Sequence, residues 1–160
     1  MIPPYIVLAE RIRSELSDIE PLIERAERAV AAIQRNPENQ DFFVDSAALN
    51  LHDFYSGLER IFQQIATNID QHLPDSRDWH RELLEQMHLA ISTLRPAVIS
   101  ESTLSSLDEF MRFRHVVRNV YTFTLDVKQI HRLVEMARPA FQSAQADLLN
   151  FALFLDEVGK

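Results

Sequence analysis

Residues 44–70 read VDSAALNLHDFYSGLERIFQQIATNID, and the spacing of the apolar residues in this stretch decides the fold class. Apolar side chains recur every three or four residues, at Val44, Ala47, Leu51, Phe54, Leu58, Ile61, Ile65 and Ile69. This is the period of one face of an α-helix, whereas a half-buried strand alternates at every second residue. Gly57 near the middle costs about 1 kcal/mol against alanine in a helix, so we interpret it as a point where a second helix approaches closely.

Two flanking stretches repeat the same period. Residues 5–33 carry an apolar stripe that follows Pro3 and Pro4, two residues that suit the first turn of a helix. Residues 130–158 carry a stripe that is almost a heptad repeat, with Asp126 as a candidate N-cap. The sequence therefore predicts three long helices, one near each terminus and one between them.

Prolines and polar residues mark the interruptions. The segment NPENQD at 36–41 predicts a turn, and LRPAVISES at 94–102 predicts an ordered loop. Pro21 and Pro139 fall inside helical patterns, where a proline lacks the N–H that the helix needs. We expect kinks or one-turn breaks at both positions.

Two shorter helices are predicted between the long ones. The first spans about 79–92, with Ser76 or Asp78 as its N-cap, and the second ends near Phe123, before a break at 124–127. Candidate caps for the second are Ser102, Thr103, or Ser105 with Asp108 in an S-x-x-D capping box. The prediction is an all-α protein, a single domain over 1–160 built as an antiparallel bundle of about five helices.

The composition limits the function. The 160 residues carry 16 Lys+Arg and 24 Asp+Glu, a formal charge of −8, which argues against a protein that coats nucleic acid by its overall charge. There are no cysteines, so disulfides and thiolate metal sites are excluded, and two glycines are too few for a P-loop or a dinucleotide fingerprint. No secretion signal or membrane span is recognisable, so we expect a soluble cytoplasmic protein with no membrane partner.

One basic stretch stands out against the negative charge: RFRHVVRNVYTF at 112–123. No carboxylate occurs from Phe110 to Leu125, so positive potential should persist locally. On a helix, one polar arc would hold Arg114, His115, Arg118, Asn119 and Tyr121. The opposite, buried arc would hold Phe113, Val116, Val117 and Val120. The plainest interpretation is an exposed basic face that pairs with glutamates of a neighbouring helix.

The same stretch resembles the HEPN ribonucleases, and among them the HepT-like toxins, whose motif is R-x4-H-x-Y near the end of a helix. Arg114, Asn119 and Tyr121 occupy the motif positions, and Asn119 departs from the motif histidine. Further blocks look like those of one HepT-like subfamily, at 49–66, 78–87, 95–100 and 113–126. The resemblance implies a HEPN-like dimeric bundle that cleaves RNA without a metal, by attack of the ribose 2′-hydroxyl on the adjacent phosphate.

The resemblance also implies catalytic roles. Arg114 would steady the charge of the phosphorane, whereas Asn119 forms hydrogen bonds but transfers no proton near neutral pH. The missing imidazole could come from His115 or from His80 on another helix, or Asn119 could orient the phosphate. Residues expected to bind RNA are Arg112, Arg118 and His80.

Assembly and regulation follow from the same resemblance. Arg114 and Asn119 lie about 140° apart on one helix, so a facing second copy would complete the site, which predicts a homodimer. HepT-like toxins are typically encoded beside an MNT-type nucleotidyltransferase, an antitoxin that transfers AMP to the motif tyrosine. Tyr121 occupies that position.

Two other functions remain open. Asn119 suits a HEPN-like binding module that holds a nucleotide or protein partner without cutting RNA. Glu85 and His88 form one Glu-x-x-His, the half-motif of di-metal bundles, but no second copy exists. We therefore predict no metal site and no cofactor.

Overall fold

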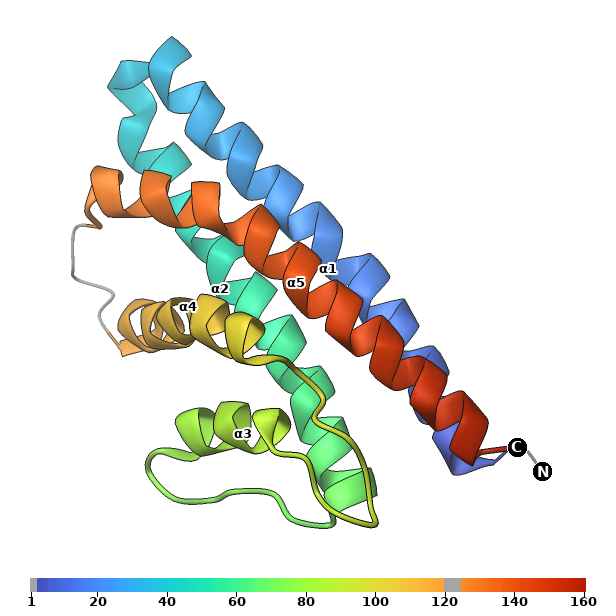
Figure 1. Ribbon diagram of the computed structural model, residues 1–160. Coiled ribbons are helices and arrows are strands. Elements are labelled where there is room, and N and C mark those ends of the chain that lie inside the picture. Colours follow the sequence, from blue (N-terminus) through green and yellow to red (C-terminus); the bar gives the residue numbers. More distant parts are fainter. Residues whose placement is uncertain (1–2, 120–124) are drawn as a thin grey trace.

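The computed structural model describes residues 3–119 and 125–160 of the chain, and these residues are almost entirely helical (Figure 1). The elements in chain order are α1 (Pro4–Arg35), the 3₁₀ turn η1 (Pro37–Asn39), α2 (Gln40–Ile65), the π-helical turn η2 (Ala66–Asp70), α3 (Trp79–His88), α4 (Glu101–Asn119) and α5 (Val127–Val158). No strand occurs within the described ranges. The predicted all-α fold with five helices is confirmed.

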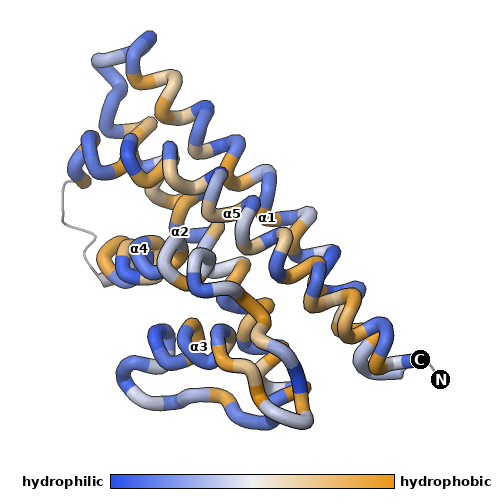
Figure 2. Tube along the Cα trace, viewed as in Figure 1, coloured by the Kyte–Doolittle hydropathy of each residue, from blue (hydrophilic) through white to orange (hydrophobic). Residues whose placement is uncertain are grey.

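The three long helices form the body of the molecule. α1 runs antiparallel to both α2 and α5 and packs against both, while α3 and α4 lie to one side and cross the second half of α2 (Figure 1). Apolar and polar residues alternate in turns along the long helices, as Figure 2 shows. The apolar faces meet in a core whose largest fully buried side chains include Tyr55, Phe54, Phe62, Phe110 and Phe141.

Gly57 lies at a close approach of α1 and α2. A Cβ atom at this position would lie 2.7 Å from Cγ1 of Ile19, which is itself buried. Real Cβ contacts are longer, so any side chain here would require Ile19 to shift within the contact between the two helices. The prediction of a close helix approach at Gly57 is confirmed.

Of the kinks or one-turn breaks predicted at Pro21 and Pro139, the breaks are wrong. α1 and α5 continue through both residues. Each proline lies on the solvent-exposed side of its helix, where water can satisfy the carbonyl left without a donor. The buried residues on either side, Ile19 and Ile23 in α1, hold the helix to the core across the missing bond.

Several helix ends differ from the prediction. α3 ends at His88, because residues 89–100 form a loop closed by a bridge between Ile91 and Arg95. α4 begins one residue before Ser102, and its cap is Ser100, whose Oγ accepts a hydrogen bond from the Thr103 N–H at 3.2 Å. The candidate caps Ser102, Thr103 and Ser105 are therefore wrong.

The other predicted boundaries are closer to the structure. α4 reaches Asn119, and the last residues of the predicted helix lie outside the described residues. Asp126 caps α5 as predicted, since its carboxylate accepts a hydrogen bond from the Lys128 N–H at 3.0 Å. α3 starts at Trp79, directly after the candidate cap Asp78, whose side chain makes no capping bond.

A buried ion pair fixes the loop after α3. The guanidinium of Arg95 is fully buried and donates hydrogen bonds to both carboxylate oxygens of Asp70, at 2.6 and 2.8 Å. It also donates to the carbonyls of Gln86 and Leu89 at the end of α3, and to that of Pro96. Every polar atom of this pair is thus satisfied, and the C-terminal end of α3 is tied to η2.

Arg95→Met should destabilise the fold by about 3–5 kcal/mol, because it leaves the Asp70 carboxylate buried without its partner. The measurement is the free energy of unfolding in urea. Arg138→Met is the matched control: Arg138 also pairs with a carboxylate, Glu27, but both side chains are more than a third exposed. That substitution should cost about 0–1 kcal/mol. Equal costs for both variants would contradict the assigned role of Arg95.

Candidate active site between α3 and α4

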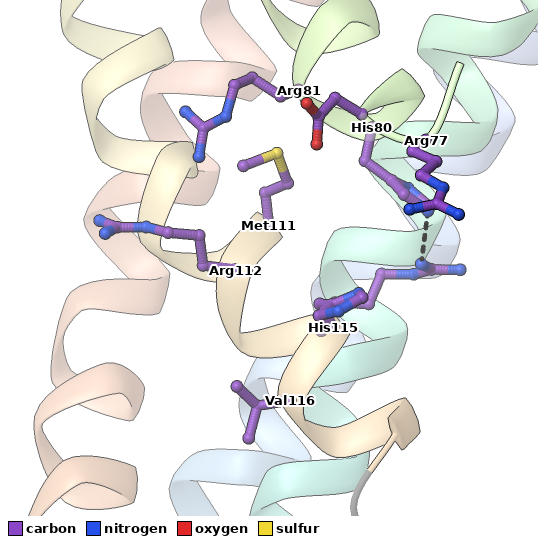
Figure 3. Close-up of a pocket in the computed structure, with 9 residues that line it drawn as sticks. Arg77, His80, Arg81, Met111, Arg112, His115 and Val116 are labelled. Carbon is purple, nitrogen blue, oxygen red and sulfur yellow. Dashed lines mark hydrogen bonds between the residues drawn. The ribbon is translucent and has the colours of Figure 1, made fainter. Parts of the chain in front are cut away.

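A cleft of about 360 Å³ separates the start of α3 from the second half of α4 (Figure 3). Its lining residues are Arg77, Asp78, His80, Arg81, Met111, Arg112, Arg114, His115 and Val116. Four of these are arginines and one is a carboxylate, so the cleft is cationic within a chain of net negative charge. Such a local concentration of arginines suits an anionic ligand.

Arg114 extends from α4 toward α2 and is largely enclosed. Its side chain is 14% exposed, and its Nε donates a hydrogen bond to Ser56 Oγ at 2.9 Å. The same Nε lies 3.8 Å from Glu59 Oε1. Its Nη1 lies 3.5 Å from His80 Nε2, the contact marked by the dashed line in Figure 3. Three neighbours from two helices therefore fix the guanidinium in one orientation at the cleft.

Two neighbours hold the His80 ring, a carboxylate at Nδ1 and an aromatic ring against one face. Its Nδ1 lies 2.6 Å from Oε2 of Glu59, a carboxylate that is only 4% exposed. Its ring stacks on Trp79, with ring centres 3.6 Å apart and an angle of 29° between the planes. Because a carboxylate only accepts hydrogen bonds, Nδ1 carries the proton. In the neutral imidazole, Nε2 then presents its lone pair beside Arg114.

Glu59 connects the two sides of this site. It lies on α2 one turn after Ser56 and Tyr55, and it is buried with Arg114 and His80 as its cationic or donating partners. Burial raises the pKa of Tyr55 well above its usual value, and the negative charge of Glu59 adds to the rise while Arg114 opposes it. The Tyr55 hydroxyl has no hydrogen-bond partner within the described part of the chain. This environment favours the neutral phenol form of Tyr55.

A second group of charges lies at the rim of the cleft. Asp108 of α4 pairs with Arg81 of α3 at 3.2 Å and with Arg112, one turn along its own helix, at 2.9 Å. Both arginines are about half exposed. Carboxylates from outside residues 110–125 reach the basic stretch: Asp108 contacts Arg112, and Glu59 approaches Arg114 from another helix, as the predicted pairing with a glutamate of a neighbouring helix allows.

The structure brings together four of the predicted site residues. Arg114, His80, His115 and Arg112 all line the cleft. Arg118 and Asn119 belong to α4, but their side chains are outside the described part of the structure, and Tyr121 lies outside the described residues. The roles predicted for these three residues stay predictions.

The predicted helical arcs need two corrections. Phe113 is buried as expected, but Val116 is 40% exposed and lines the cleft. Arg114, which was expected on an exposed polar arc, points into the protein. The reason is that α4 packs against both α2 and α3, so Arg114 contacts the polar side chains of Ser56 and Glu59 on α2.

Sequence reasoning missed Ser56, Glu59, Arg77 and Arg81. Glu59 carried a signal: it directly follows Leu58 in the apolar stripe of α2, at a position that the structure buries. A carboxylate at a buried position needs a cationic partner, and the basic stretch of α4 was the available source. The pairing of the two segments could not be read from either one alone.

The remaining histidines lie outside the cleft lining. His52 contacts Asp53, His88 contacts the Ile99 carbonyl and His131 contacts Glu135. Among residues 3–119 and 125–160, no three or more metal-ligating side chains gather as a metal site would require, so the single Glu85-x-x-His88 gains no support. No helix in the same ranges has the length and apolar character needed to span a membrane.

A family model described as HepT-like protein matches residues 46–155, a range that includes Glu59, His80 and Arg114. The chain belongs to the HepT-like family. The family points to the HEPN toxin superfamily and, in general terms, to a toxin–antitoxin context. The helical bundle agrees with the fold expected of a HepT-like protein. Comparisons with curated proteins and with solved structures gave no match.

Proposed function

We propose that this HepT-like protein is the toxin of a HEPN/MNT toxin–antitoxin pair and acts as a metal-independent endoribonuclease in the cytoplasm. The observation that carries the proposal is the contact between Arg114 and His80 in the cationic cleft. It places a fixed guanidinium beside an imidazole, one group that can stabilise phosphorane charge and one that can transfer a proton. Family membership supports the same class of reaction.

Arg114 binds the scissile phosphate. In the reaction the ribose 2′-oxygen forms a bond to phosphorus and the bond to the 5′-oxygen breaks, which gives a 2′,3′-cyclic phosphate and a 5′-hydroxyl. Negative charge builds on the phosphorane oxygens during this step. Because Ser56 and Glu59 already orient the Arg114 guanidinium, its N–H groups stabilise that charge without reorganising in the transition state.

His80 transfers the proton. Its Nε2 lone pair accepts the proton of the attacking 2′-hydroxyl, and the resulting imidazolium is stabilised by Glu59 at Nδ1. The same group can return a proton to the departing 5′-oxygen. In this arrangement the imidazole comes from His80 on α3, so the reaction does not need a histidine at the motif position on α4, where this chain has Asn119.

The proposal assigns different tasks to the other predicted residues. Asn119 and His115 would contact the substrate or its phosphate, and Arg118 would bind RNA along α4. A homodimer with facing α4 helices would extend the cleft across two copies. A solution mass that corresponds to one chain at micromolar concentration would contradict the dimer.

The test of the proposal is cleavage of single-stranded RNA by the purified protein in excess EDTA. We expect cleavage at a rate unchanged by EDTA, with products that end in a 2′,3′-cyclic phosphate. The second candidate function is a binding module, which the asparagine at position 119 favours. RNA binding without any cleavage would select that candidate and reject the ribonuclease.

Tyr121 is the proposed site of inhibition. Co-expression with an MNT-type nucleotidyltransferase and ATP should add one or more AMP groups at Tyr121, because a phosphodiester there would compete for the arginines that bind RNA phosphate. Intact-protein and peptide mass spectrometry measures the addition. Tyr121→Phe should prevent the addition. Tyr5→Phe is the control, because it makes the same substitution far from Tyr121 in the sequence, and it should not prevent the addition. An unmodified Tyr121 beside a partner of verified activity would leave complex formation as the inhibitory mechanism.

A further inference from the structure

We infer that Arg81 and Arg112 form a second phosphate subsite, which binds the phosphodiester next to the one that is cleaved, and that Asp108 occupies this subsite when no RNA is bound. The inference deepens the proposed function and rests on it, since it defines the substrate as an oligoribonucleotide with at least two adjacent phosphates. It also means that the charged residues at the rim, Arg81, Arg112 and Asp108, determine the affinity for RNA.

Two pairs of side chains cross the groove between α3 and α4 in the same way. In one pair His80 of α3 contacts Arg114 of α4 directly, and in the other Arg81 of α3 and Arg112 of α4 each contact one carboxylate oxygen of Asp108. The pairs are neighbours, because the α3 members are consecutive and the α4 members are two residues apart. In Figure 3 Arg81 and Arg112 lie on one side of the pocket with Met111 between them, and His80 lies on the other side.

Each pair surrounds a carboxylate, but the two carboxylates differ in burial. Glu59 is 4% exposed and is a permanent part of the first pair. Asp108 is 32% exposed, and its two partners are 48% and 59% exposed. Exposed ion pairs of this kind contribute little free energy, so an incoming phosphate can replace Asp108 at small cost. A phosphate offers the two guanidinium groups the same kind of oxygen acceptors as the carboxylate.

The surrounding charges limit the subsite to one phosphate. A second depression, lined by Arg81, Leu84, Glu85, Leu104, Ser105 and Asp108, continues the groove beyond this pair. It adds the carboxylate of Glu85 and no further cation. Asp78 lines the main cleft as its single carboxylate, opposite four arginines. Favourable potential therefore covers two adjacent phosphates and falls off beyond Arg81.

The test measures binding of a 2′-O-methyl oligoribonucleotide, which has the phosphates of RNA but no 2′-hydroxyl to react. Arg112→Ala should weaken binding roughly tenfold at low salt, as expected for loss of a charge-assisted contact, and should reduce the slope of log K against log[salt] by about 0.7. Asp108→Asn should tighten binding roughly two- to fivefold, the change that corresponds to the free energy of an exposed ion pair.

The second ion pair of α4 supplies matched controls. Glu109 pairs with Arg132 of α5 at 2.6 Å with similar exposure, but neither residue lines the cleft. Arg132→Ala and Glu109→Gln change the net charge by the same amounts as the test variants. Glu109 also lies near enough to act electrostatically on Arg112, so these variants report the effect of charge on α4 and α5 without the direct contacts that Asp108 makes to Arg81 and Arg112. Both should leave affinity and salt slope close to wild type.

The outcomes separate this inference from the ribonuclease proposal. The subsite is wrong if Arg112→Ala has the same affinity for the oligoribonucleotide as Arg132→Ala, and Asp108→Asn the same affinity as Glu109→Gln. This holds even when the protein cleaves RNA. Weaker binding by Asp108→Asn would also overturn it, since Asp108 would then hold the arginines in place for RNA. The expected pattern in a protein that cuts no RNA would support the subsite and reject only the cleavage step.

Discussion

Replacement of Arg114 by alanine should reduce RNA cleavage at least about 10²–10³-fold, the loss typical of removing one group that stabilises transition-state charge. The effect should fall on the rate of the bound complex, because Arg114 is oriented by Ser56 and Glu59 before substrate arrives. Single-turnover cleavage of a labelled oligoribonucleotide, with enzyme in excess, measures this rate directly.

A conservative and a remote variant make the Arg114 result specific. Arg114→Lys keeps the charge but loses the planar fork that reaches Ser56 and His80 together, so its rate should stay well below wild type. Arg132→Ala removes an arginine from α5, outside the cleft lining, and should cleave at the wild-type rate. Undiminished cleavage by Arg114→Ala would place the active site elsewhere. The basic residues of α4 would then be solvent-exposed charges with no role in catalysis.

His80→Gln should lower the single-turnover rate by about 10²–10⁴-fold, the usual contribution of general acid–base catalysis. Glutamine can still donate a hydrogen bond to Glu59, so the buried carboxylate keeps a partner and the fold is preserved. It cannot transfer a proton. Thermal unfolding of the variant should therefore be close to wild type while cleavage is lost.

The matched control for His80 is His115→Gln. Both histidines line the cleft, and His80 Nδ1 lies 2.6 Å from Glu59 and His80 Nε2 lies 3.5 Å from Arg114. The proposal assigns the proton transfer to His80, so His115→Gln should retain more activity than His80→Gln. Added imidazole should partly restore cleavage by His80→Ala, which a purely structural role would not allow. A large loss in His115→Gln with an active His80→Gln would move the proton transfer to the motif helix.

Glu59 should act as a positioning residue for both groups. Glu59→Gln removes the charge that stabilises the His80 imidazolium and orients Arg114, so we expect a smaller loss of rate than in His80→Gln and a shifted pH–rate profile. A loss of stability with an unchanged pH–rate profile would show that Glu59 serves the fold alone.

The helices themselves could be read from the sequence because each buries a stripe of apolar residues at helical spacing. The stripe of α2 gave its extent, and Gly57 gave the place where α1 approaches. Pro21 and Pro139 misled the prediction of breaks, since a local rule about the proline ring takes no account of the packing that lets α1 and α5 continue through both positions.

The candidate site could be read only in part. The basic stretch and the resemblance led to Arg114, and His80 was one of two possible sources of the imidazole. What could not be read was the tertiary pairing: Glu59 is 21 residues before His80 and 55 before Arg114 in the chain, and only the crossing of α2, α3 and α4 brings the three together. The one local signal of this tertiary contact was the charged side chain of Glu59 at a buried position of α2.

The most direct test of the central claim uses a DNA oligonucleotide with a single internal ribonucleotide, incubated with the protein in EDTA and analysed by mass spectrometry. We predict one cut, on the 3′ side of the ribonucleotide, that leaves a 2′,3′-cyclic phosphate on one product and a 5′-hydroxyl on the other, with no cleavage of the all-DNA strand. Cleavage of the all-DNA strand, or products with a 3′-hydroxyl and a 5′-phosphate, would contradict attack by the 2′-hydroxyl and with it the roles assigned to Arg114 and His80.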